Sequence, residues 1–109
     1  MIGTAHQIER AEEIKMRVNG EFNRVAECLR AVSTRQTEPA RSETHVALRI
    51  LEQKRDEVMA NNRAGYFIQQ WGEMTDQVRR MIAQDPRHQA LREARATRRS
   101  EAVGEIGIQ

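Results

Sequence analysis

The chain has 109 residues, a net charge of +2, 39% hydrophobic residues, 31% charged residues and only four aromatic side chains. With so little apolar volume to outweigh about 1–2 kcal/mol of backbone entropy per ordered residue, we expect a homodimer or a constitutive hetero-complex. There is no apolar run approaching the ~20 residues of a membrane span, no signal-peptide pattern and only one cysteine, Cys28, so we expect a cytoplasmic protein without membrane contact or an intramolecular disulfide.

The first third of the chain carries apolar side chains at every third or fourth position, the spacing of one helical face. These side chains are Ile8, Ala11, Ile14, Val18, Phe22, Val25, Leu29 and Val32. They predict a helix over about residues 5–33 with Thr4 as its N-cap. Asn19-Gly20 is also a hairpin signal, but the apolar stripe stays in phase through the glycine. We therefore predict a helix that Gly20 can kink.

The segment from Ser33 to Ala40 is the first clear break, where Pro39 disfavours a helical Glu38 but is tolerated in a first helical turn. A second helix is therefore expected to begin between Thr37 and Ser42. Its first apolar positions are Val46, Ile50, Leu51 and Val58. A further stripe with three-four alternation follows at Ala64, Phe67, Trp71, Met74, Val78 and Met81. We predict one long helix over about 42–83 with a local interruption at 60–65. The alternative is that Asn62 or Gly65 ends the second helix as a left-handed C-cap.

The last helix is predicted from Asp85-Pro86, in which Asp85 is the N-cap and Pro86 takes the first helical position. This basic C-terminal helix covers about 85–103, and its few apolar side chains are too small to dock it firmly. The tail 104–109 shows no helical pattern. The fold class that follows is all-α, an antiparallel helical hairpin or small three-helix bundle with a long central helix and coiled-coil-like packing. The last helix either caps this hairpin or projects from it.

Catalytic and metal-binding residues are not expected. His6, His45 and His88 have no partners at metal-ligand spacing, and zinc needs three or four converging ligands. We therefore interpret them as exposed histidines, and Cys28, next to the first stripe, as a buried structural cysteine. No phosphate-binding loop or nucleophile motif occurs, so we predict no enzyme activity, no cofactor and no metal.

One candidate partner-binding surface is an aromatic cluster, which comprises Tyr66, Phe67, Trp71 and Met74. One helical face cannot bury all four side chains. Either Phe67, Trp71 and Met74 are core and Tyr66 lies at a wet edge, or part of the cluster docks a protein partner, since Trp, Tyr and Met are enriched at interfaces.

A second candidate is the basic run of the last helix, which comprises Arg87, Arg92, Arg95, Arg98 and Arg99. Such a strip can bind phosphates or an acidic protein, or it is simply the solvated face of an alanine-rich helix. We predict a non-enzymatic protein–protein interaction protein: an adaptor, a chaperone-like binder, an inhibitor or an assembly subunit. The alternatives are nucleic-acid binding through these arginines, and a structural component of a virus particle or secretion assembly.

Overall fold

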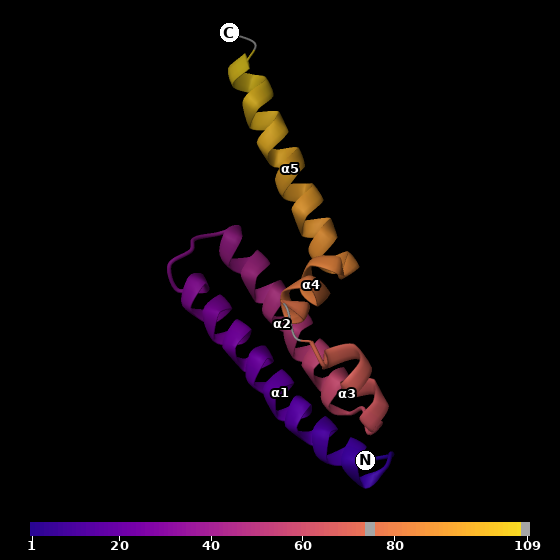
Figure 1. Ribbon diagram of the computed structural model, residues 1–109. Coiled ribbons are helices and arrows are strands. Elements are labelled where there is room, and N and C mark those ends of the chain that lie inside the picture. Colours follow the sequence, from indigo (N-terminus) through magenta and orange to yellow (C-terminus); the bar gives the residue numbers. More distant parts are fainter. Residues whose placement is uncertain (74–75, 108–109) are drawn as a thin grey trace.

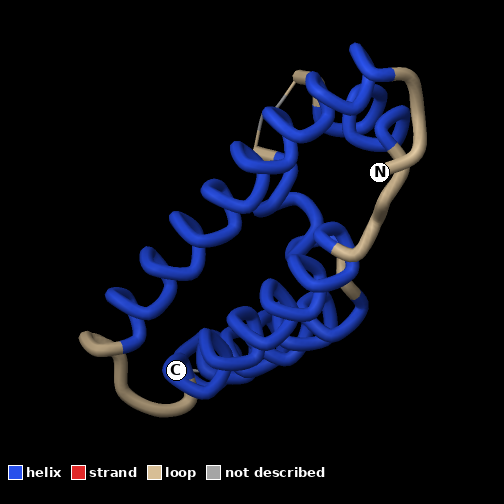
Figure 2. The backbone as a smooth tube through the Cα atoms, turned by 90° about the horizontal axis from the view of Figure 1, so that it is seen from below, coloured by secondary structure: helices blue, strands red, loops and turns tan. Residues whose placement is uncertain are grey.

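The structure is a computed structural model that describes residues 1–73 and 76–107, with side chains described up to residue 100. In these ranges it contains five helices and no strand, which confirms the all-α prediction (Figure 2). The helices are α1 (Ala5–Ser33), α2 (Ala40–Met59), α3 (Ala64–Trp71), α4 (Gln77–Gln84) and α5 (Pro86–Gly107).

Helix α1 has the predicted bounds and the predicted cap. The Thr4 hydroxyl accepts the Gln7 backbone N–H at 3.2 Å, and the Gln7 amide oxygen accepts the Thr4 N–H at 2.9 Å, which completes a capping box. The helix continues through Gly20, so the hairpin signal is not used. The buried stripe runs from Ala11 to Val25, while Val32 at its end is 46% exposed.

Helices α1 and α2 form the predicted antiparallel hairpin (Figure 1). Helix α2 begins at Ala40, inside the expected window between residues 37 and 42. Its buried face includes Ala47, Ile50, Leu51 and Val58, which pack with the α1 stripe into one core. The core therefore lies along the hairpin, with Ile50, Leu51 and Val58 buried as predicted, whereas Val46 is only half-buried and Ala47 takes its place.

The prediction of one helix over 42–83 is wrong, because α2 ends at Met59 and α3 begins at Ala64, so the chain breaks at the predicted interruption near 60–65. The Asn61 side chain accepts the Arg63 N–H at 2.9 Å, a local turn that competes with the helix. The N-terminal residue Ile2 then donates to the Asn62 carbonyl at 2.6 Å and accepts from Ala64 N–H at 2.9 Å. A distant segment thus takes the backbone groups that a continuous helix would use.

A second break, which the sequence pattern did not indicate, separates α3 from α4. A Cβ atom at Gly72 would lie 2.5 Å from the Ile68 carbonyl oxygen, so only glycine fits the observed end of α3. Asp76, just before α4, has a left-handed backbone with φ 51°. The break lets α3 pack on α1 while α4 packs mainly on α2, so both short helices bury their apolar faces.

Helix α5 begins as predicted at Pro86. The Asp85 carboxylate accepts the Arg87 backbone N–H at 2.9 Å, the contact expected of an N-cap. The helix continues to Gly107, so residues 104–107 are helical instead of a tail without helical structure, while residues 108–109 lie outside the described chain. No proline follows Pro86 to end the run of good helix formers.

The molecule is strongly elongated because α5 projects from the hairpin instead of capping it (Figure 1). Its dimensions are 69 × 24 × 19 Å and its radius of gyration is 18.3 Å, against about 13 Å for a compact domain of similar length. Helix α5 touches the rest of the described chain only at α4 and α2. Most of its length therefore lies outside the core.

Candidate interaction surfaces

The chain uses most of the aromatic cluster internally. Phe67 is fully buried and Trp71 is 3% exposed, with the Trp71 ring centroid 6.0 Å from that of Phe22. The half-buried Tyr66 stands at the edge, where its hydroxyl oxygen accepts the Trp71 indole N–H at 3.1 Å. Met74 lies outside the described residues. Partner binding by this cluster stays a prediction. Among its described members, Tyr66 is the one whose side chain is accessible to a partner in this conformation.

The five arginines of α5 fall into two groups. Arg87 binds both Asp85 carboxylate oxygens at 3.0 Å, and Arg95 and Arg98 both bind the carboxylate of Glu43 on α2. Arg92 and Arg99 make no hydrogen bond or ion pair with any described residue. The predicted basic strip is therefore neutralised in large part by carboxylates of the same chain.

Glu43 is the anchoring residue that sequence reasoning missed. Its side chain is 9% exposed, and its two oxygens lie 2.5 Å from the guanidinium groups of Arg95 and Arg98. The hydrogen bonds from Arg95 and then Arg98 lower the pKa of Glu43 below its ordinary value. A signal was present in the sequence, because Glu43 lies four residues before Ala47 on the buried face of α2, where a carboxylate needs a cationic partner.

Asp85 is the second anchor of α5. Its side chain is buried and accepts from the side chain and backbone of Arg87, with Lys54 Nζ at 3.9 Å. The Arg87 contacts, aided by the Lys54 charge, lower the pKa of Asp85 to about 2. Arg87 also donates to Gln53 on α2 at 2.7 Å. Two buried carboxylates, one at the base and one along the helix, thus fix the direction in which α5 projects.

An apolar groove of about 320 Å³ lies where α1, α4 and the base of α5 meet over α2. Its lining comprises Val25, Cys28, Leu29, Val32, Ala47, Arg79, Ile82, Ala83 and His88. It exists because α3 covers the N-terminal half of α1, whereas the C-terminal half has only α2 and part of α4 against it. The sequence pattern places Val32 in the core stripe and gives no sign that this end is left uncovered.

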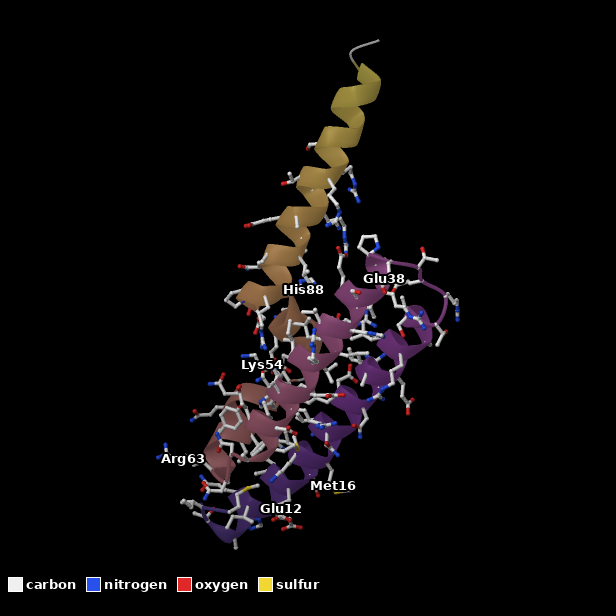
Figure 3. The ribbon with its side chains drawn as sticks, turned by 180° about the vertical axis from the view of Figure 1, so that it is seen from behind. Glu12, Met16, Glu38, Lys54, Arg63 and His88 are labelled. Atoms are coloured by element: carbon white, nitrogen blue, oxygen red, sulfur yellow. The ribbon has the colours of Figure 1, made fainter. Side chains whose placement is uncertain are left out.

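Two residues of the groove differ from expectation. Cys28 is exposed, so the prediction of a buried structural cysteine is wrong: it stands beside the buried face of α1, at the groove. His6 and His45 are exposed as expected, but His88 at the base of α5 is half-buried (Figure 3). Its Nδ1 atom finds no hydrogen-bond partner among the described residues. Burial, followed by the charges of Arg92 and Arg95, lowers the pKa of His88.

Within the ranges that the structure describes, no three His, Cys, Asp or Glu side chains come together as metal ligands. None of the helices, over their described residues, combines the length and apolar character needed to span a membrane. Comparisons with protein-family models, with curated proteins and with solved structures found no match. The surfaces that remain for a partner are therefore the exposed side of α5 and the apolar groove.

Proposed function

We propose that the protein is a non-enzymatic helical binding protein whose hairpin, with α3 and α4, supports α5 as an arm for a protein partner. The observation that carries this proposal is the exposure of α5, in which every side chain from Arg92 to Ser100 is exposed. Isolated helices are marginal in water and gain most of their stability from packing. A long helix that touches the rest of its own chain only at α4 and α2 is suited to pack against another protein.

The anchors at the base of α5 support the same function. Asp85 and Glu43 hold the helix in one direction before any partner arrives. Binding by a pre-oriented helix loses less conformational entropy than binding by a free segment. Helix α5 is therefore an arm with a defined direction rather than a loose extension.

A protein partner is favoured over nucleic acid by the state of the arginines. Arg87, Arg95 and Arg98 already pair with Asp85 or Glu43, and each phosphate contact would have to compete with these carboxylates. The described part of α5 also carries no Phe, Tyr or Trp side chain on which bases could stack. The arginine strip therefore serves first to anchor the arm.

The proposal is tested by breaking the arm without touching the hairpin core. Ala94 is exposed in the middle of α5, and proline in a helix interior costs about 3 kcal/mol. Proteins captured from the native cell by the unchanged chain should be lost with Ala94→Pro and kept with the helix-compatible control Ala94→Gln. Capture of the same proteins by both variants would contradict a role for the arm.

The nucleic-acid alternative is tested on the same chain with duplex DNA and RNA in a salt series. We expect no specific complex at physiological salt. Tight binding that falls steeply with salt and disappears when Arg92, Arg95 and Arg99 are replaced by alanine would favour nucleic acid as the partner. Nuclease treatment of the captured material separates direct from nucleic-acid-mediated protein contacts.

A further inference from the structure

The groove has the form of a receptor for a helix. Its α1 wall is made by Val25, Cys28, Leu29 and Val32, which stand at positions i, i+3, i+4 and i+7. The segment 25–32 that carries these four side chains extends over about 10 Å, or two helical turns. Ala47 of α2 and Ile82 of α4 also line it. An amphipathic helix laid in such a groove contributes anchors at the same spacing.

The charge around the groove is positive. Arg79 of α4 is the only charged side chain that lines it among the described residues, and His88 lines it from the base of α5. Arg92, close enough to His88 to lower its pKa, has no carboxylate partner of its own in the described chain. The carboxylate of Glu21 pairs with Arg24 and lies close enough to Arg79 for that charge also to lower its pKa, while Glu43 pairs with Arg95 and Arg98. An occupant with carboxylates beside its apolar face would complement these charges.

We propose that the groove between α1, α4 and the base of α5 binds an amphipathic helix of a partner protein, with apolar anchors over two turns flanked by Asp or Glu. The inference rests on the proposed function and adds the chemistry of the partner and its place of docking. Val32, 46% exposed at the open end of the groove, is the apolar contact most available to it. Arg79 and Arg92 are the groups that select carboxylates.

A second copy of the chain is a poorer occupant of the same groove. A two-fold contact places the same surface on both sides, so a symmetric dimer through the groove would bring Arg79 and Arg92 of both copies into one interface. Like charges across an interface oppose association. The acidic helix of a different protein removes this repulsion and replaces it with attraction.

Cys28 provides a direct reporter of occupancy, because it is exposed, lines the groove and is the only cysteine in the sequence. The measurement is the rate at which uncharged N-ethylmaleimide modifies Cys28 in the full chain. Three cysteine-free helical peptides are compared: one with leucines at i, i+3, i+4 and i+7 flanked by glutamates, one with the same leucines flanked by lysines, and one with the acidic sequence scrambled. The acidic peptide should slow modification by about tenfold or more at saturation, and the other two should not.

Matched variants locate the contact. Val32→Asp places a carboxylate in the groove and should lower the affinity for the acidic peptide by about tenfold or more. Met16→Asp is the control, since Met16 is an exposed apolar residue on the same helix, 78% exposed and far from the base of α5 (Figure 3). Its effect should stay within about twofold. Arg79→Glu should weaken the acidic peptide and strengthen the lysine-flanked one.

The result that overturns the inference is equal protection of Cys28 by all three peptides, or none by any. A second result would also overturn the inference: protection of Cys28 that rises with the concentration of the protein itself, together with the mass of a dimer that Val32→Asp returns to that of one chain. The groove would then be a self-association surface. These results would rule out helix binding by the groove without ruling out the proposed function. If the groove binds no acidic helix while Ala94→Pro still loses the captured partner, the arm acts without the groove.

Discussion

Gly3 shows how one residue fixes the N-terminal end of the molecule. It has φ 153°, a value that side chains rarely adopt, and a Cβ there would lie 2.9 Å from the Ala64 Cβ and 3.2 Å from Gln7 Oε1. Gln7 is half of the α1 capping box, and Ala64 follows the bridge to Ile2. A side chain at position 3 would therefore disturb both the start of α1 and the turn before α3.

The first prediction compares two glycines. Gly3→Ala should lower the free energy of unfolding by about 1–3 kcal/mol because of backbone strain and steric conflict. Gly20→Ala should raise it by about 1 kcal/mol, since a Cβ there meets no atom within 4 Å and alanine is the better helix former. Urea unfolding followed by Trp71 fluorescence measures both. A destabilising Gly20→Ala would mean that α1 is not a continuous helix at that point.

Side chains with local partners were the most predictable from sequence. Thr4 and Asp85 cap their helices because the bonds of a cap are made within three residues. Glu43 was not identified, because its partners lie 52 and 55 residues away. The burial of Cys28 was wrongly predicted for a related reason. Whether the flank of α1 is covered depends on where α4 and α5 lie, and the apolar spacing of α1 does not predict those positions.

At the scale of the element, the direction of α5 depends on its two carboxylate anchors. We predict that Glu43→Gln loosens the attachment of α5 to α2. The free energy of this attachment should fall by only about 1 kcal/mol, because both guanidinium partners are half exposed and solvent screens the pairing. Spin labels on Cys28 and on a Ser100→Cys variant report the distance between α1 and α5. The distribution should broaden for Glu43→Gln and stay narrow for Glu93→Gln, a matched change on an exposed residue of α5. Equal distributions would show that Glu43 does not hold the arm.

Acid should release the arm in two stages. The lowered pKa of His88 means that protonation favours the detached helix as pH falls below 6.5. The lowered pKa values of Glu43 and Asp85 mean that their contribution is present above about 4.5 and is lost as pH falls towards 2. The distance distribution of the same label pair should broaden in both pH ranges, and His88→Gln should remove the broadening in the range below 6.5. A distribution constant from pH 7 to 2, with the hairpin folded, would contradict these anchors.

The helices themselves were predictable to different degrees. Helix α1 and the start of α5 follow from a regular stripe and strong capping signals. The long helix expected over 42–83 failed because Ile2, far away in sequence, binds the backbone beside Arg63, and because Gly72 permits a second break. Helix periodicity records which residues can share a face, and it does not record competing backbone partners from elsewhere in the chain.

At the scale of the whole molecule, the apolar residues are concentrated in the hairpin, α3 and α4. The described part of α5 adds no fully buried hydrophobic residue to this core. Composition predicted a thin core that a partner completes, and the proposed acidic helix in the groove would cover Val32 and Leu29. A hetero-complex is the form of association that this distribution of apolar and basic residues favours, and self-association is distinguished from it by light scattering.

Helix α5 projects from the hairpin, and this direction sets the shape of the whole molecule. Small-angle X-ray scattering on the peak that elutes from a size-exclusion column tests this projection most directly. The measurement is made at concentrations where light scattering gives the mass of one chain, 12.6 kDa. A projecting arm predicts a radius of gyration near the 18.3 Å of the Cα trace and a maximum dimension near 69 Å. A radius of gyration of about 13 Å, that of a compact domain of this length, would show that α5 folds back onto the hairpin and would contradict a projecting α5.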